Sequence, residues 1–151
     1  MPPPAADSRF PVPNQIRAMI PADLDSARKL WAEAEGIEIA EGDGAEELTR
    51  YLARNPGLST VATDDAGNVV GAVLCGHDGR RGFVYHLAVA STHRGDGIGR
   101  AIVQRSLAGL KDVGVSRVLL LVAAENVGGR DFWLRLGWED MTFAKPMGFD
   151  L

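Results

Sequence analysis

The chain has 151 residues, of which 46% are hydrophobic and 24% charged, a composition typical of one globular domain with a substantial core. A net charge of −4 argues against nucleic-acid binding through bulk positive charge, and no apolar run approaches the roughly 20 residues that cross a membrane. Cys75, the single cysteine, excludes an internal disulfide and fits a reducing compartment. We therefore expect a cytoplasmic protein with neither a nucleic-acid nor a membrane partner.

The N-terminal part of the chain predicts a tail, a strand and two helices. Residues 1–14 are rich in proline and lack the apolar stretch of a signal peptide, so we expect a flexible tail ahead of a single domain at 15–151. Pro21 and two early aspartates are typical of a helix start. The expected elements are a strand over 14–20, a helix over 21–35 and a helix over 44–55.

The rest of the chain alternates strands with helices. Turn residues separate strands at 58–63, 69–77 and 83–89, and a long helix from 98, a strand at 117–124, a helix at 128–137 and one or two strands within 138–149 follow. The run 117–124 is apolar almost throughout, as in a central strand buried on both faces, and Gly137 is a plausible C-cap of the helix before it. This order predicts an α/β fold (an α+β mixed sheet) with helices on both faces.

A glycine-rich loop joins the strand ending at Val89 to the long helix. Gly95, Gly97 and Gly99 lie at the predicted helix N-terminus, where free N–H groups and the helix dipole favour an anion. Arg94 and Arg100 add positive charge. These residues indicate a phosphate or pyrophosphate ligand, and the alternative is a glycine-rich connection that binds nothing.

Two common phosphate loops do not match this pattern. A Walker loop needs Lys and Ser or Thr after its last glycine, and Ile98-Gly99-Arg100 supplies neither. A dinucleotide fingerprint has the spacing G-x-G-x-x-G and an acidic residue about 20 positions later. Here the spacing is G-x-G-x-G, and the apolar run 117–124 occupies the place of that acid.

Two segments resemble motifs of the GNAT superfamily of N-acetyltransferases. Arg94-x-x-Gly97-x-Gly99 is similar to the family's (Q/R)-x-x-G-x-(G/A) pyrophosphate loop. Residues 125–139 resemble its N-x-x-A-x-x-(L/F)-Y-x-x-x-G-F segment, which is matched by Asn126, Phe132, Gly137 and Trp138. The likeness extends from about Ile16 to the C-terminus and is greatest to small bacterial stand-alone members, including the YpeA-like branch.

This resemblance implies a fold and a binding site for acetyl-CoA. The fold is a GNAT-like three-layer sandwich whose fourth and fifth strands splay apart to admit the cosubstrate. Backbone groups of Leu87, Ala88 and Val89 pair with the pantetheine arm, Asn126 contacts it, and residue 133 lies beside the sulfur. The pyrophosphate is wrapped by Arg94, Gly95, Asp96, Gly97, Ile98, Gly99 and Arg100.

Trp133 departs from the family pattern. The family often has a tyrosine here that protonates the leaving thiolate, whereas an indole N–H donates hydrogen bonds without serving as an acid near neutral pH. This change is compatible with acetyl-CoA binding, but it removes the general acid from this position. The competing interpretations are therefore a module that binds acetyl-CoA or CoA without turnover and a transferase for another acyl-CoA.

Transfer to an amine needs a neutral nitrogen, and at pH 7 only about one lysine-like amine in two thousand is neutral. His86 is the leading candidate for the base, because it is the titratable group of an otherwise apolar strand. A hydrogen-bonded core histidine is an equal alternative. Glu125 is the second catalytic candidate, although an exposed carboxylate at a strand end explains it as well.

Other reactive residues have simpler explanations. Asp78 and the adjacent His77 fit a hairpin turn, although Asp78, Arg80 and Arg81 could also line an acceptor entrance. Cys75 lies in an apolar strand, where burial would raise its pKa and make it a poor nucleophile. The histidines and the cysteine show no metal-ligand spacing, so we expect no metal.

An acidic segment offers a candidate acceptor site. Residues 33–47 contain seven acids and no lysine or arginine. In the family this region borders the acceptor pocket, where an acidic rim would attract a cationic amine. A solvated helix face is the alternative, and Trp31 is expected in the core with an edge that could reach the pocket. We therefore expect an N-acetyltransferase, monomeric or homodimeric, that moves the acetyl group to a primary amine by direct attack in a ternary complex.

Overall fold

A computed structural model describes residues 15–151, so the predicted tail at 1–14 lies outside the described residues. The strands are β1 (Gln15–Ala18), β2 (Thr60–Thr63), β3 (Val69–His77), β4 (Gly82–Val89) and β5 (Val118–Leu119). The helices are α1 (Leu24–Glu33), α2 (Ala45–Arg54), α3 (Ile98–Asp112) and α4 (Val127–Arg135), with short 3-10 turns at Pro21–Asp23 and Ser91–His93. The element order through α4 is the predicted one.

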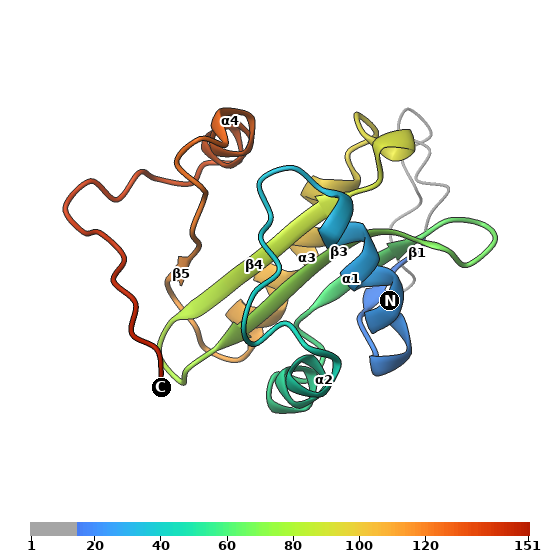
Figure 1. The fold of residues 1–151 in the computed structure, drawn as a ribbon, viewed down its shortest axis with the longest axis horizontal. Helices are drawn as coiled ribbons and strands as arrows, with labels where there is room; N and C mark the ends of the chain where they lie inside the picture. The colour runs from blue at the N-terminus through green and yellow to red at the C-terminus, as the bar shows by residue number, and fades with distance from the viewer. Residues whose placement is uncertain (1–14) are drawn as a thin grey trace.

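The strands form one mixed sheet in the order β1-β2-β3-β4-β5 (Figure 1). The pairs from β1 to β4 are antiparallel, and β4 pairs with β5 in parallel. A parallel partner requires a crossover, which α3 provides on one face of the sheet. The predicted mixed α/β sheet is therefore confirmed.

The sheet separates two hydrophobic cores. On one face, α1 and α2 contribute Leu24, Trp31 and Leu48 to a core with residues of β2, β3 and β4. On the other face, Ile98, Ile102 and Leu110 of α3 pack on Val73, Cys75 and Val84. Figure 1 shows the same three layers, with α1 and α2 on the viewer's side of the sheet and α3 behind it. This confirms helices on both faces.

An ion pair joins β1 to the start of α1. Both guanidinium nitrogens of Arg17 donate to the Asp23 carboxylate, at 2.7 and 2.8 Å, and the Ile20 amide donates to it at 2.9 Å. Burial alone would raise the pKa of Asp23, but these hydrogen bonds and the positive charge of Arg17 outweigh it, so this pKa lies below its usual value.

Asp23→Asn is expected to lower the free energy of unfolding at pH 7 by about 1.5–3 kcal/mol, as for hydrogen bonds to charged groups. Because the folded-state pKa is depressed, the wild-type advantage is complete above the unfolded pKa of about 3.9 and is lost as the pH falls through the folded value. Urea unfolding of both proteins at pH 7 and pH 3 tests this. An equal difference at both pH values would contradict the ion-pair explanation.

The pairing between β4 and β5 is short. It covers Gly82 with Val118 and Phe83 with Leu119, and a further backbone hydrogen bond of 2.9 Å joins Gly82 N to Arg117 O. Beyond Phe83, β4 continues to Val89 without a partner on this side among the described residues. The fourth and fifth strands therefore separate toward the C-terminal end of β4, as the resemblance implied.

The expected central strand at 117–124 is wrong in length and in burial. Only Val118 and Leu119 form a strand, and β5 is an edge of the sheet within the described chain. Val118 and Leu120 pack against the α3 core, whereas the side chain of Leu121 is 73% exposed. The apolar run covers one side of a core instead of lying between two strands.

The final strands expected within 138–149 are also absent from the described structure, where this segment is irregular. Pro146 lacks the N–H group that a sheet ladder needs, and no strand of the described chain pairs with the segment. Trp138 packs against the α3 core, but Phe143, Met147 and Phe149 are all at least 82% exposed. No helix of residues 15–151 is long and apolar enough to cross a membrane.

Candidate active site

The glycine loop lies at the N-terminus of α3, as predicted. Gly97 is the N-cap residue in the left-handed conformation at φ 80°, Gly95 has φ 87°, and α3 begins at Ile98. A Cβ atom at either glycine would meet no heavy atom within 4 Å, so backbone conformation and not crowding requires glycine here. The residues from Arg94 to Gly97 are exposed, which leaves the loop open to a ligand.

Arg94 links this loop to the end of β4. Its Nε donates to the carbonyl oxygen of Val89 at 3.2 Å, while its side chain remains exposed. Arg100, in the first turn of α3, is exposed as well. The loop therefore combines two arginines with a helix N-terminus, an arrangement suited to a pyrophosphate.

A β-bulge interrupts β4 in front of the loop. Leu74 pairs with Tyr85 and Ala72 pairs with Ala88, so His86 and Leu87 together oppose a single residue of β3. His86 has φ 56°. Among the described residues, it is the one non-glycine residue with a positive φ. Adjacent residues of a regular strand point to opposite faces, but the bulge turns both Tyr85 and His86 toward the α1 and α2 side.

His86 is held on this side by two contacts. Its Nε2 lies 2.9 Å from Oδ2 of Asp43, in the loop between α1 and α2. Its ring lies 5.4 Å from the ring of Trp31, which is completely buried in α1. The core assignment of Trp31 is confirmed, and its ring packs against His86 without lining the pocket itself.

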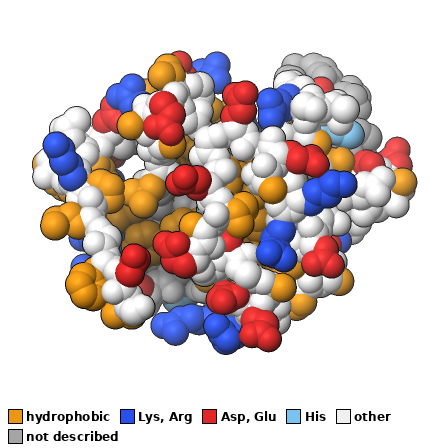
Figure 2. Space-filling view, viewed as in Figure 1, with side chains coloured by type: hydrophobic (Ala, Val, Ile, Leu, Met, Phe, Trp, Pro, Cys, Tyr) orange, Lys and Arg blue, Asp and Glu red, His pale blue; other side chains and the backbone are white. Residues whose placement is uncertain are grey.

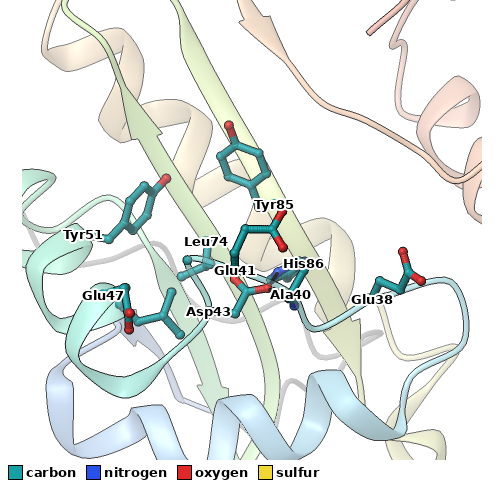
Figure 3. A pocket seen from close by; sticks show the side chains of 11 residues that line it. Glu38, Ala40, Glu41, Asp43, Glu47, Tyr51, Leu74, Tyr85 and His86 are labelled. Atoms are coloured by element: carbon teal, nitrogen blue, oxygen red, sulfur yellow. Dashed lines mark hydrogen bonds and ion pairs between the residues drawn. The ribbon is translucent and has the colours of Figure 1, made fainter. Parts of the chain in front are cut away.

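These side chains border a pocket of about 370 Å³ between the α1–α2 loop, α2 and β4 (Figure 3). His86, Tyr85 and Tyr51 line it, and four carboxylates belong to its wall: Glu38, Glu41, Asp43 and Glu47. Figure 3 shows the Asp43 side chain against His86. No lysine or arginine of the described chain lines this pocket, so its electrostatic character is acidic.

The space-filling view shows that acidic side chains also border a hollow on this face of the molecule (Figure 2). In Figure 2, hydrophobic side chains gather in a hollow beside the α1–α2 loop, and acidic side chains stand along its border. In the orientation of Figure 1 this hollow lies between that loop and the C-terminal segment. The acidic run at 33–47 thus contributes four carboxylates to a pocket and is more than a solvated helix face.

Two tyrosines line the pocket, and the hydroxyl of one of them, Tyr51, is buried. Burial raises the pKa of Tyr51 and of Tyr85, so both phenols are protonated at neutral pH. The Tyr51 hydroxyl is buried without a hydrogen-bond partner within residues 15–151 and lies against Gly76, where a side chain would collide with it. Sequence analysis did not identify either tyrosine, because only the fold brings α2 and the bulge of β4 together.

The second motif lies at the far side of the separated strands. The Asn126 side chain caps α4 by accepting from Gly129 N at 3.0 Å, and it stands so close to Gly36 that a Cβ there would collide with it. Phe132 lies near Gly99, where a Cβ would be 3.5 Å from its ring. The α4 helix therefore stands next to the N-terminus of α3, and Gly137, at φ 93°, ends it as predicted.

The predicted site residues divide into three groups. Leu87 is the second residue of the bulge, and Ala88 and Val89 follow it and lead into the glycine loop, so the cofactor candidates of β4 lie directly before that loop. Trp133 is half-buried, edge-on to Phe132 and Trp138, in contact with the α3 core. Glu125 is exposed and does not line the pocket that contains His86.

The residues with simpler explanations have structural roles. The Asp78 carboxylate accepts from the amides of Arg80 and Arg81, and the Nδ1 atom of His77 accepts from Gly79, so both residues build the turn before β4. Cys75 is buried, and desolvation raises the pKa of its thiol to about 12, which makes it a poor nucleophile. The turn and core interpretations are confirmed.

A protein-family comparison matches residues 24–138 to the model described as the acetyltransferase (GNAT) family. An acetyltransferase of Sodalis glossinidius is 30% identical over 125 residues, which cover 83% of this chain and 87% of that protein. The match spans both motifs and the acidic α1–α2 region.

Solved structures show the same architecture. Ard1 from Thermoplasma volcanium superposes with a TM-score of 0.73 at 21% identity and covers 83% of this chain and 82% of its own. A Mycobacterium tuberculosis protein solved in complex with CoA has a TM-score of 0.64 at 25% identity, with 84% of this chain and 72% of its own covered. With the separated strands and the glycine loop, these matches establish that the chain belongs to the acetyltransferase (GNAT) family of acyl-CoA N-acyltransferases.

Proposed function

We propose that the protein transfers the acetyl group of acetyl-CoA to a primary amine by direct attack in a ternary complex. The observation that carries the proposal is the position of the β4 bulge. It aims His86 into an acidic pocket on one side, while the next residues, Leu87 to Val89, lead into the glycine loop on the other. An amine in the pocket therefore meets a thioester held along β4.

The residues present fit acetyl-CoA. Gly95 and Gly97 form a cradle without side chains at the N-terminus of α3, where Arg94 and Arg100 would hold the pyrophosphate with Asp96, Ile98 and Gly99. The free edge of β4 offers the backbone groups of Leu87, Ala88 and Val89 to the pantetheine amides, and Asn126 and Trp133 close the far side. Bound acetyl-CoA would supply the acyl group: the C–N bond to the amine would form and the C–S bond would break. The acylated nitrogen would lose its second proton to solvent, and the departing thiolate would gain one from solvent.

His86 would remove the proton that prevents the amine from attacking. Because Nε2 faces Asp43, the other ring nitrogen, Nδ1, is available to the acceptor. Returning a lysine-like ammonium to its neutral form costs about 4.6 kcal/mol at pH 7, which a base in contact with the nitrogen offsets. Glu125 stays an alternative base for an amine that enters from the exposed side.

The acidic pocket indicates a cationic amine as the acceptor. Glu38, Glu41 and Glu47 contribute negative charge without a cationic residue among the pocket's described lining. Such a pocket raises the local concentration of a cation and is sensitive to ionic strength.

We expect Glu47→Gln to raise the KM for spermidine about threefold to tenfold at low salt, with little change in kcat, because one attractive charge is removed from the pocket wall. Initial-rate measurements at 20 and 300 mM salt check this, and the difference between wild type and variant is expected to shrink at high salt. A difference in KM between wild type and variant that does not depend on salt would indicate that Glu47 acts through direct contact with the amine instead of through its charge.

Release of the CoA thiol from acetyl-CoA, measured across a panel of amines, tests the proposed function. The panel contains polyamines, aminoglycosides, amino acids and peptides with free N-termini or lysines. Turnover that favours cationic amines supports the proposal. Acetyl-CoA binding by calorimetry without turnover of any amine would favour a binding module, the alternative that Trp133 supports. Turnover of a longer acyl-CoA instead would support a different donor.

A further inference from the structure

We infer that Asp43 is a positioning residue that fixes the tautomer and orientation of the His86 ring, an inference that rests on the proposed function of His86 as base. The two residues are 43 positions apart in the chain, and their side chains meet at 2.9 Å where the α1–α2 loop crosses β4 (Figure 3). The Asp43 and His86 side chains are 12% and 19% exposed, so water competes little for this contact.

A single oxygen of Asp43 holds the arrangement. Its Oδ2 accepts from Nε2 of His86 at 2.9 Å and from the backbone amide of Ala40 at 3.1 Å. A carboxylate only accepts hydrogen bonds, so Nε2 of His86 carries the proton and Nδ1 of the neutral ring carries the lone pair. The Nδ1 lone pair, which acts as the base, is therefore directed away from Asp43.

The loop that carries Asp43 is itself fastened. The Asp43 amide donates to Ala40 O at 3.2 Å, and Nε of Arg28 in α1 donates to Asp43 O at 3.1 Å. Two backbone hydrogen bonds therefore hold Asp43 in addition to the contact between its side chain and the Ala40 amide. Removing the carboxylate should release the ring while most of the loop stays fixed.

The His86 ring is constrained on its remaining sides. The bulge gives the backbone a left-handed conformation that projects the side chain toward α1, and the buried ring of Trp31 packs at 5.4 Å. Neither contact distinguishes one ring nitrogen from the other. Asp43 is the described residue whose hydrogen bond makes that choice.

Proton transfer then follows a defined route. A proton leaves the acceptor nitrogen for Nδ1 of His86, and the ring becomes an imidazolium that still donates from Nε2 to Asp43. The negative charge of Asp43 stabilises this cation, and the proton passes from Nδ1 to solvent after the step. Asp43 neither gains nor loses a proton.

The first test observes the tautomer without substrate. Protein labelled with 15N-histidine contains three imidazole rings, and loss of one set of signals in His86→Asn identifies His86. In the wild type, correlations between ring nitrogens and carbon-bound hydrogens should show the Nε2–H tautomer of the neutral ring. Asp43→Ala should give a mixture of both tautomers, and Asp43→Asn should keep the Nε2–H form because one amide oxygen can accept both hydrogen bonds.

The matched control is Glu47→Ala, which removes a carboxylate from the same pocket without touching the His86 ring. Its His86 spectrum should equal that of the wild type. An unchanged tautomer in Asp43→Ala, in a folded protein with wild-type acetyl-CoA affinity, would overturn the inference. Thermal unfolding and calorimetry establish those two conditions.

The second test is a double-mutant cycle with acetyl-CoA and spermidine. Asp43→Ala should lower kcat about 100-fold in the wild type and less than twofold in His86→Asn, because Asp43 acts through His86. Glu47→Ala should have the same effect in both backgrounds. An equal loss on removing Asp43 in both backgrounds would assign it a general structural or charge role.

The pH dependence of kcat gives a further readout. The titratable and charged groups around the His86–Asp43 pair belong to several elements. Glu38, Glu41, Glu47, Tyr51 and Tyr85 line the same pocket, and Arg28 of α1 donates to Asp43 O. Asp43→Ala should move the acidic limb of the profile, whereas Glu47→Ala should move it less. If no variant and no wild-type protein acetylates spermidine or any other amine of the panel, the proposed function fails, and the tautomer measurement still decides the role of Asp43.

Discussion

Replacing Gly97 by valine is expected to weaken acetyl-CoA binding at least tenfold in a protein that still folds. Gly97 caps α3 at φ 80°, a left-handed conformation that costs a residue with a Cβ about 1–2 kcal/mol and a β-branched one more. The chain would relieve this strain by moving the loop. The amides at the start of α3 would then no longer converge on the pyrophosphate, and a side chain would enter its place.

Gly114→Val is the matched control for this experiment. Gly114 follows the other end of α3 at φ 91°, and a Cβ there would also meet no atom within 4 Å. Both variants should lose similar stability in urea unfolding, but only the Gly97 variant should lose affinity by calorimetry. If the folded Gly97 and Gly114 variants bound acetyl-CoA with equal affinity, the glycine loop would not be part of the binding site.

The His86→Asn variant is expected to lose about 10²–10⁴-fold in kcat, the usual contribution of a general base, while its acetyl-CoA dissociation constant changes less than twofold. Asparagine is the informative replacement because it tolerates the left-handed conformation that the bulge requires at φ 56°. The backbone of Leu87 to Val89, which we assign to the thioester and pantetheine, therefore stays in place.

The pH dependence of this variant separates a base from a core residue. At higher pH a larger fraction of the amine is already neutral, so the deficit of His86→Asn should shrink as the pH rises toward 10. Initial rates with spermidine between pH 6 and pH 10 provide the measurement. A deficit that is constant with pH, accompanied by lower thermal stability, would return His86 to a structural role.

Local chemistry explains which parts of the fold were predictable from the sequence. The glycine loop and the Gly137 cap depend on backbone conformations that glycine alone adopts freely, so spacing was sufficient to place them. The prediction of a central strand at 117–124 was wrong because an apolar stretch indicates burial but not on how many sides the strand is buried. The strand prediction for 138–149 was wrong because the residues of a segment do not show whether a partner strand exists.

The pocket side of the site was only partly predictable. His86 was identified from its chemistry, and the acidic run suggested a cation, but neither pattern indicated that Asp43 would contact His86. Strict alternation along β4 would have placed Tyr85 and His86 on opposite faces. A bulge has no reliable signal in a single sequence, so the convergence of these side chains required the fold.

The bulge in β4 has a consequence for how such a protein diversifies. The pocket proposed for the acceptor is built from the α1–α2 loop and α2, on one layer of the sandwich, while the glycine loop belongs to the opposite layer. The two share only a few residues of β4 around His86. If the proposed function holds, substitutions within 38–51 are expected to change which amine is accepted while leaving the proposed acetyl-CoA site unaltered.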